Sequence, residues 1–151
     1  MRSNAERFKW SDLTSFDKSF WLLTGSCVVI YSSIYPYMQV ASDLLQTKYH
    51  FDKVTAGYLF GIPYIIGAIF APPLGLMIDK YGRRAFLCCL SSVILLVAFT
   101  LSMFATECDK CHKELLSLVL IGWGWTIYAA AIWGTIPLVV APHTVGTAFG
   151  M

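Results

Sequence analysis

Four long stretches of the chain contain no Asp, Glu, Lys or Arg, and short polar links separate them. Each stretch exceeds the roughly 20 residues that an α-helix needs to cross the hydrocarbon core of a bilayer. Apolar residues occur all round each stretch, whereas the helices of a water-soluble bundle keep one polar face. The pattern therefore predicts an all-α membrane protein with four transmembrane helices, at Phe20–Ser42, Val54–Ile78, Ala85–Thr106 and Leu115–Pro142.

The segments outside these stretches are short and polar. Residues 1–19 are mixed in sign and lack the apolar core and small-residue cleavage site of a secretory leader. The links Asp43–Lys53, Asp79–Arg84 and Glu107–Glu114 leave no room for a soluble domain, so neighbouring helices are expected to run antiparallel. Residues 144–151, "TVGTAFGM", resemble the start of a further helix, as expected of a partial chain.

The composition agrees with a membrane as the solvent, because 57% of residues are hydrophobic, 13% are charged and the mean hydropathy is +0.63. The net charge of +2, without a basic tract among aromatic residues, argues against a nucleic-acid partner. Basic residues are more numerous on the side of the N-terminus, which predicts that this side is cytosolic. That side holds Arg2, Arg7, Lys9, Lys18, Lys80, Arg83 and Arg84, and the other side Lys48, Lys53, Lys110 and Lys113.

The link "GLMIDKYGRR", residues 75–84, concentrates charge between two apolar stretches. Gly75 lets another helix approach closely, and Gly82 permits the positive φ of a tight turn. Asp79 is expected to accept hydrogen bonds from a helix N-terminus. The basic residues Lys80, Arg83 and Arg84 are expected at the headgroups, paired with acids of adjacent helices. Together these residues predict a breakable latch; the alternative is a positive-inside signal without further function.

The same residues match every defined position of G-x-x-x-D-[RK]-x-G-[RK]-[RK], a loop signature of the major facilitator superfamily, which the chain resembles. Trp133 followed by Val139-Val140, and the segment 146–150, resemble the second half of transporters of the lysosomal major facilitator superfamily domain-containing protein 1 type. The resemblance implies export of dipeptides by a carrier with two six-helix halves, working with a glycosylated single-span partner. This chain would be part of the C-terminal half and would need the remaining helices.

Trp133 is the leading candidate for a substrate contact. It shares a helical face with the small residues Gly122, Thr126 and Ala129, so its ring is expected to project into a central cavity. An indole can stack on a ligand or attract an ammonium group. The alternative is ordinary packing between helices.

Tyr31 and Tyr35, one helical turn apart, form a second candidate pair, with Tyr128 behind them. Ordinary core packing is the alternative for all three. Trp123 and Trp125 lie nearer the start of their stretch and are expected to belong to an interfacial aromatic belt.

Glycine and proline recur in the second stretch, where Gly57, Gly61, Pro63 and Gly67 precede Pro72-Pro73. This spacing predicts close helix packing, and a rocking element is the alternative. None of the four stretches carries an ionisable Asp, Glu, Lys or Arg. The chain therefore offers no proton relay within the membrane, which favours a facilitative carrier.

The link "ECDKCHK" matches the C-x-x-C-H motif of haem attachment, with Cys108, Cys111 and His112. So short a link between two spans offers no pocket for haem, and a zinc site lacks a second ligand cluster. A local disulfide between Cys108 and Cys111, or two free thiols, is the expectation. No cofactor or metal is expected, and without a phosphate-binding loop, paired carboxylates or a serine elbow the chain is not expected to be an enzyme.

The pattern and the resemblance together predict a multi-pass membrane protein, in the lysosome or another endomembrane by resemblance. Its expected function is transport of a small organic solute, dipeptide-like by resemblance, by alternating access within a larger carrier. Its expected partners are lipid, the solute, and the remaining carrier helices or another membrane subunit. The alternative is a structural four-span subunit of a membrane assembly that does not transport.

Overall fold

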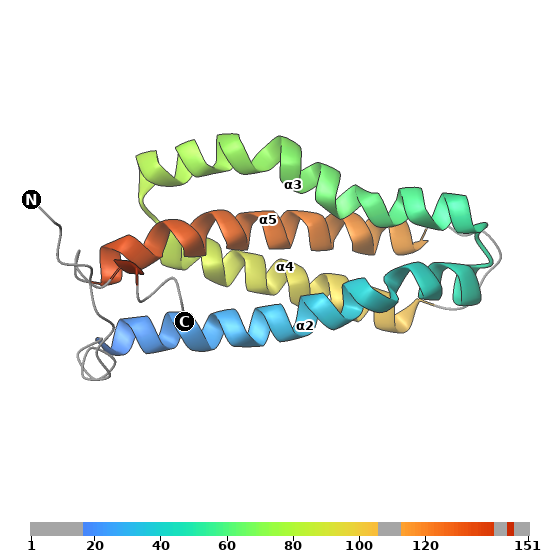
Figure 1. The fold of residues 1–151 in the computed structure, drawn as a ribbon, viewed down its shortest axis with the longest axis horizontal. Helices are drawn as coiled ribbons and strands as arrows, with labels where there is room; N and C mark the ends of the chain where they lie inside the picture. Colours follow the sequence, from blue (N-terminus) through green and yellow to red (C-terminus); the bar gives the residue numbers. More distant parts are fainter. Residues whose placement is uncertain (1–16, 106–112, 141–144, 147–151) are drawn as a thin grey trace, which may run out of the picture.

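The computed structural model describes residues 17–105, 113–140 and 145–146, and these residues form an all-helical bundle (Figure 1). Each long helix corresponds to one charge-free stretch, so the predicted all-α fold is confirmed for this part of the chain. The Cys108 and Cys111 prediction, most of residues 1–19 and most of the expected helix at 144–151 lie outside the described residues. The long helices are α2 (Lys18–Tyr49), α3 (Lys53–Tyr81), α4 (Arg84–Phe104) and α5 (Lys113–Val139).

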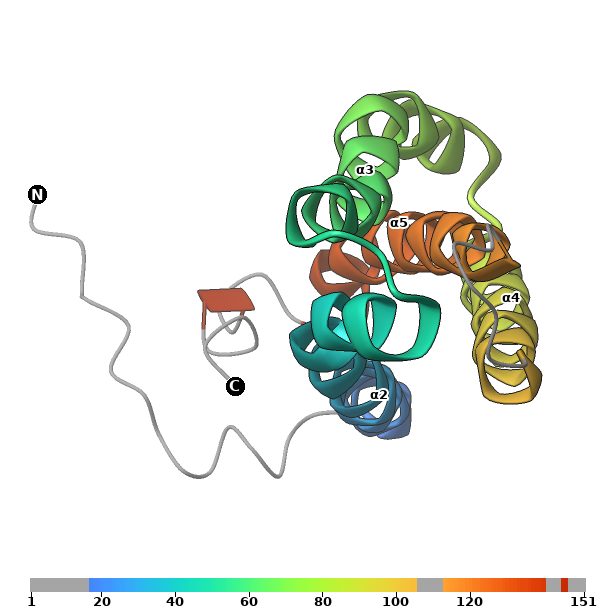
Figure 2. The same ribbon diagram turned by 90° about the vertical axis from the view of Figure 1, so that its right-hand side faces the viewer.

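Helix α5 lies between α3 and α4, as Figure 2 shows along the bundle. Its contacts with these two helices are the most extensive in the bundle, and α2 contacts α3 and α5 less extensively. Because the links are short, each helix reverses the direction of the one before it. The N-terminus of α2, the α3–α4 turn and the C-terminus of α5 therefore share one end of the bundle (Figure 1).

Two glycines explain why α5 has close neighbours on two sides. A Cβ added at Gly122 would lie 2.9 Å from the Cα of Pro63 on α3, and one at Gly124 would lie 2.8 Å from Cγ of Leu95 on α4. Ordinary carbon contacts are about 3.5–4.0 Å long, so neither position has room for a larger residue. Small residues thus let two helices approach the α5 backbone.

The α3–α4 turn is tight because Gly82 adopts the left-handed conformation. Its φ is 65°, as the sequence predicts, and its N–H donates to the carbonyl of Ile78 over 2.8 Å. At the other end of the bundle, α2 continues beyond Ser42 to Tyr49 and ends at His50 with φ 53°. The α2 helix is therefore longer than the predicted membrane span.

Helices α3, α4 and α5, the last from Glu114 onward, are long and apolar enough to cross a membrane. Among the described residues α2 does not reach the same apolarity, because serine, tyrosine and glutamine recur along it, so three helices rather than the predicted four pass this test. Within the apolar window of α3 only 6% is buried inside the chain. The outer surface of α3 therefore needs lipid or further helices as its surroundings.

Candidate functional site: the Arg84 network and the aromatic cluster

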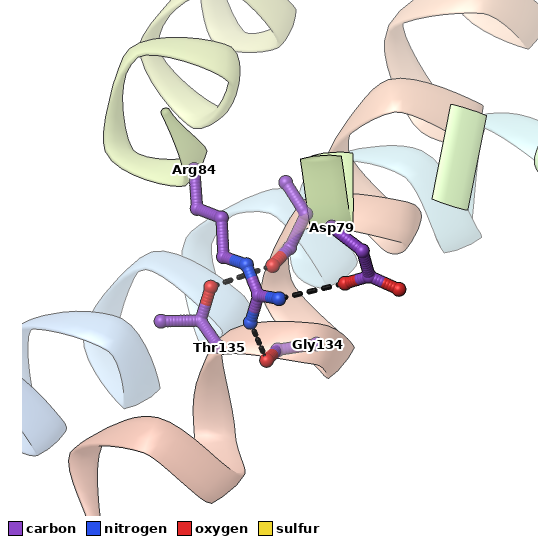
Figure 3. A network of polar contacts seen from close by, with 5 residues as sticks. Asp79, Arg84, Gly134 and Thr135 are labelled. Carbon is purple, nitrogen blue, oxygen red and sulfur yellow. Dashed lines mark hydrogen bonds and ion pairs between the residues drawn. The ribbon is translucent and has the colours of Figure 1, made fainter. Parts of the chain in front are cut away.

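The guanidinium of Arg84 joins the α3–α4 turn to α5 (Figure 3). Its Nη2 lies 2.8 Å from Oδ1 of Asp79, and its Nη1 donates to the backbone carbonyl of Gly134. The Arg84 side chain is 16% exposed, whereas that of Asp79 is 70% exposed. We call Asp79, Arg84 and Gly134 the Arg84 network; it connects α3, α4 and α5 at this end of the bundle.

Gly134 makes room for the guanidinium. A Cβ at this position would lie 3.4 Å from Nη1 of Arg84, so a larger side chain would compete with the cation for space. The planar fork of arginine reaches the Gly134 carbonyl through one nitrogen and the Asp79 carboxylate through the other.

The other loop residues take less specific positions. Asp79 is held by the Arg84 side chain, whereas a bond from a helix N-terminal amide was expected; Arg84 itself begins α4. A Cβ at Gly75 would meet nothing within 4 Å, so the expected close approach of a helix is not formed among the described residues. Lys80 lies over the ring of Tyr81, with Nζ 5.9 Å from its centre, and Arg83 is exposed.

Aromatic side chains from α2 and α5 form a second group of contacts. The rings of Tyr31 and Tyr35 stack with their centres 5.5 Å apart, and the ring of Trp125 meets Tyr31 edge-on at 4.9 Å. The Trp133 side chain lies close enough to the Tyr31 hydroxyl to interact with it. Tyr35 and Trp133 are each about half exposed. We call Tyr31, Tyr35, Trp125 and Trp133 the aromatic cluster; it presents aromatic rings to a ligand or to an adjacent helix.

Tyr128 lies in the core and not on this surface. It is 0% exposed, and its hydroxyl lies 3.0 Å from Oγ of Ser26 on α2. The small residues that precede Trp133 along α5 face α3: Gly122 meets Pro63, and Oγ1 of Thr126 lies 3.5 Å from a Cβ built at Gly67. The face expected to line a cavity is thus a packing surface over these turns.

Two of the glycines predicted to pack, Gly57 and Gly61, do not do so within the described residues. A Cβ at either would meet nothing within 4 Å. The contacts of α3 with α5 use Pro63 and Gly67 instead. The spacing of small residues marked the correct helix, but the face in contact is rotated from the Gly57–Gly61 face.

A groove of about 240 Å³ runs between α2 and α4, and no residue of the aromatic cluster lines it. Its walls are aliphatic except for Phe99 and the hydroxyls of Ser33 and Ser92. Both hydroxyls already donate to backbone carbonyls of their own helices, to Val29 and Cys88. The groove therefore has little means of recognising a polar solute.

Sequence reasoning missed two members of this site. Gly134 takes part through its carbonyl oxygen, and a backbone acceptor has no sequence signature. Trp125 was expected at an interface, yet it lies near the middle of α5, which begins at Lys113 and ends at Val139. Counting its distance from the helix ends would have placed it level with Tyr31 and Tyr35.

The family model described as Major Facilitator Superfamily matches residues 2–151. The chain is also similar to proteins named "Lysosomal dipeptide transporter MFSD1". The identity is 27% to that of Gallus gallus, 29% to that of Danio rerio and 27% to that of Homo sapiens, each over 96% of this chain. The chain spans 30–32% of the length of these relatives. All three are named as transporters, which agrees with the expectation that the chain is not an enzyme.

Proposed function

Because the chain belongs to the Major Facilitator Superfamily, we propose that it is part of a membrane carrier that moves a small organic solute by alternating access. The observation that carries this proposal is the Arg84 network beside the aromatic cluster. A carrier needs a contact that holds one state and breaks in the other. The network supplies such a contact at Gly134, which directly follows Trp133 of the aromatic cluster along α5.

The Arg84 network is suited to breaking and reforming. Its bond to α5 ends on a backbone carbonyl at Gly134, and its ion pair ends on the exposed carboxylate of Asp79. An exposed ion pair contributes about 0–1 kcal/mol, so neither state is locked by it. Movement of the α3–α4 turn against α5 would release the guanidinium and shift the backbone directly after Trp133.

The solute is proposed to be dipeptide-like, by similarity to the named relatives. Aromatic faces such as Trp133 and Tyr35 attract an ammonium group by about 0.5–2 kcal/mol. Neither α2 from Phe20 to Ser42 nor α5 after Glu114 carries a basic residue. The carboxylate of a dipeptide would therefore bind to a cation on other helices of the carrier, which are the proposed protein partners.

We also propose that α2 is a fourth transmembrane helix. It lies along the other helices (Figure 1) and carries no charge from Ser19 to Ser42. Its polar groups find partners inside the bundle or helix: Ser26 meets Tyr128, and Thr24 donates to the carbonyl of Phe20. Lipid thus meets few unsatisfied groups. By similarity to its relatives, the proposed membrane is that of the lysosome, with the N-terminal side in the cytosol.

Uptake of a radiolabelled dipeptide into proteoliposomes tests the proposal, using the protein with the membrane subunits that co-purify with it. Saturable uptake that unlabelled dipeptide competes is expected. Trp133→Ala should raise the half-saturation concentration roughly 2- to 30-fold, the equivalent of a lost cation–π contact. Trp21→Ala is the matched control, because Trp21 is 48% exposed and Trp133 46% exposed.

Two outcomes would contradict the proposal. Correct insertion without saturable uptake would reject a carrier and favour the structural-subunit alternative. Unchanged uptake in Trp133→Ala, with the control also unchanged, would remove the proposed role of the aromatic cluster while leaving the carrier intact.

A further inference from the structure

A carboxylate is buried at the end of the bundle opposite to the Arg84 network. Glu114, in the first turn of α5, is 1% exposed. Its Oε1 accepts hydrogen bonds from the hydroxyls of Tyr37 over 2.7 Å and Ser102 over 2.5 Å, and its Oε2 accepts one from Tyr49 over 3.0 Å. We call these four residues the Glu114 cluster. The charge pattern places Glu114 in a polar link, but the fold encloses it.

The Glu114 cluster connects three helices through hydrogen bonds to one carboxylate. Tyr37 and Tyr49 belong to α2, Ser102 to the last turn of α4, and Glu114 to the first turn of α5. Pro36 directly precedes Tyr37 and interrupts the hydrogen bonds of α2. The two tyrosines thus hold the half of α2 that follows Pro36, and the proline offers a point about which that half can move.

The groups around Glu114 leave its charge without a direct counter-ion among the described residues. From α2, the ammonium of Lys48 donates to the backbone carbonyl of Ser102 over 3.5 Å and lies 5.6 Å from the centre of the Tyr49 ring. Burial and the Glu114 carboxylate raise the pKa of Tyr49 to about 12, so this hydroxyl remains a donor at physiological pH. Ser102 from α4 does not titrate, and α3 contributes Ala56 to the adjacent apolar cluster.

We propose that Glu114 is a proton-binding site whose ionised form holds the second half of α2 against α4 and α5, and whose protonation releases it. The ionised carboxylate accepts all three hydroxyl protons, and it lies in the first turn of a helix, where an anion is favoured. The neutral acid brings a proton of its own, which must be accepted by one of three hydroxyls that already donate. The displaced hydroxyl proton then faces a buried, apolar surrounding, because Tyr49 is 0% exposed.

The inference does not depend on transport, and its test reads structure rather than uptake. Hydrogen–deuterium exchange of residues 37–49 is measured for the full chain in phosphatidylcholine nanodiscs from neutral to acidic pH, corrected for the intrinsic pH dependence of exchange. Protection is expected to fall on acidification. Glu114→Gln, which imitates the neutral acid, should show low protection at every pH. Asp43→Asn is the matched control, because Asp43 is an exposed carboxylate within the same segment.

Tyr49→Phe keeps the test decisive if Glu114→Gln does not fold. It removes one donor to the ionised form, so the midpoint of the exchange transition should move up by about one pH unit, a tenfold change in proton affinity. The proposal is overturned if the unmodified chain shows no transition, if Glu114→Gln retains it, or if the midpoint in Tyr49→Phe is unchanged. Loss of the transition in Asp43→Asn would also overturn it, since the proton would then bind elsewhere.

Discussion

The contact between α5 and α3 should depend on the absence of a side chain at Gly122. In Gly122→Ala the new Cβ would lie 2.9 Å from the Cα of Pro63, and 3.1 Å from Cδ1 of Ile66. The Ile66 Cδ1 can rotate away, but the Pro63 Cα and the Ile66 Cβ, which would lie 3.3 Å away, are fixed by the backbone of α3. Relief therefore requires α3 and α5 to separate by several tenths of an ångström along their contact.

The expected cost follows from this overlap. Extra methyl groups in a well-packed core cost about 1–3 kcal/mol. Replacing glycine by alanine inside a helix also contributes about 1 kcal/mol of stabilisation through the backbone. Gly61→Ala on α3 gains the same backbone term and meets nothing within 4 Å. The free energy of unfolding of Gly122→Ala should thus lie about 1–3 kcal/mol below that of Gly61→Ala.

Thermal unfolding of both variants in the same detergent, followed by tryptophan fluorescence, measures this difference. Gly122→Ala should have the lower Tm, by about 2–4 °C for each kcal/mol in a chain of this size. Equal midpoints for the two variants would refute the close contact between α3 and α5. A lower midpoint for Gly61→Ala would instead show that the Gly57–Gly61 face is the one that packs.

Two further predictions concern polar contacts. Asp79→Asn should change the Tm little, because the Asp79 carboxylate is 70% exposed, but it should slow the switching between states in single-turnover uptake. Arg84→Lys should both slow the switching and lower the Tm, because the single nitrogen of lysine cannot bridge Asp79 and Gly134 as the arginine fork does. The network is dispensable if both variants turn over normally. Ser26→Ala should lower the free energy of unfolding by about 1–3 kcal/mol, since the buried Tyr128 hydroxyl would retain only the weak contact with the Cys27 sulfur at 3.7 Å. Ser32→Ala, on the exposed face of α2, should leave the free energy of unfolding unchanged. Equal losses in both variants would contradict the hydrogen bond between Ser26 and Tyr128.

The helices and the loop could be predicted because their signals are local. Lipid requires about 20 apolar residues in a row, which makes each span visible without knowledge of its neighbours. The turn at Gly82 was visible for the same reason, since its conformation depends on one residue and the short link around it. Charge alone did not show where α2 ends, because Asp43 and Lys48 lie within the helix beyond the predicted span.

The partners of the site residues could not be predicted in the same way. Arg84 was singled out, but its contact on α5 is the carbonyl of Gly134, which any residue type would provide. Glu114 was assigned to a link because the pattern shows charge and not enclosure. Its three hydroxyl donors come from positions 37, 49 and 102, which only the packing of α2 and α4 against α5 brings together.

By itself, the sequence determined that the chain forms long apolar helices, that short links reverse their direction, and that a charged turn joins two of them. Those features follow from interactions within a segment or between a segment and its solvent. Only the tertiary structure decided that α5 lies between α3 and α4, that Arg84 reaches Gly134, and that Glu114 is enclosed. These depend on which helix faces fit together, and apolar helices in lipid share so similar a hydrophobic surface that shape and a few hydrogen bonds select the neighbours.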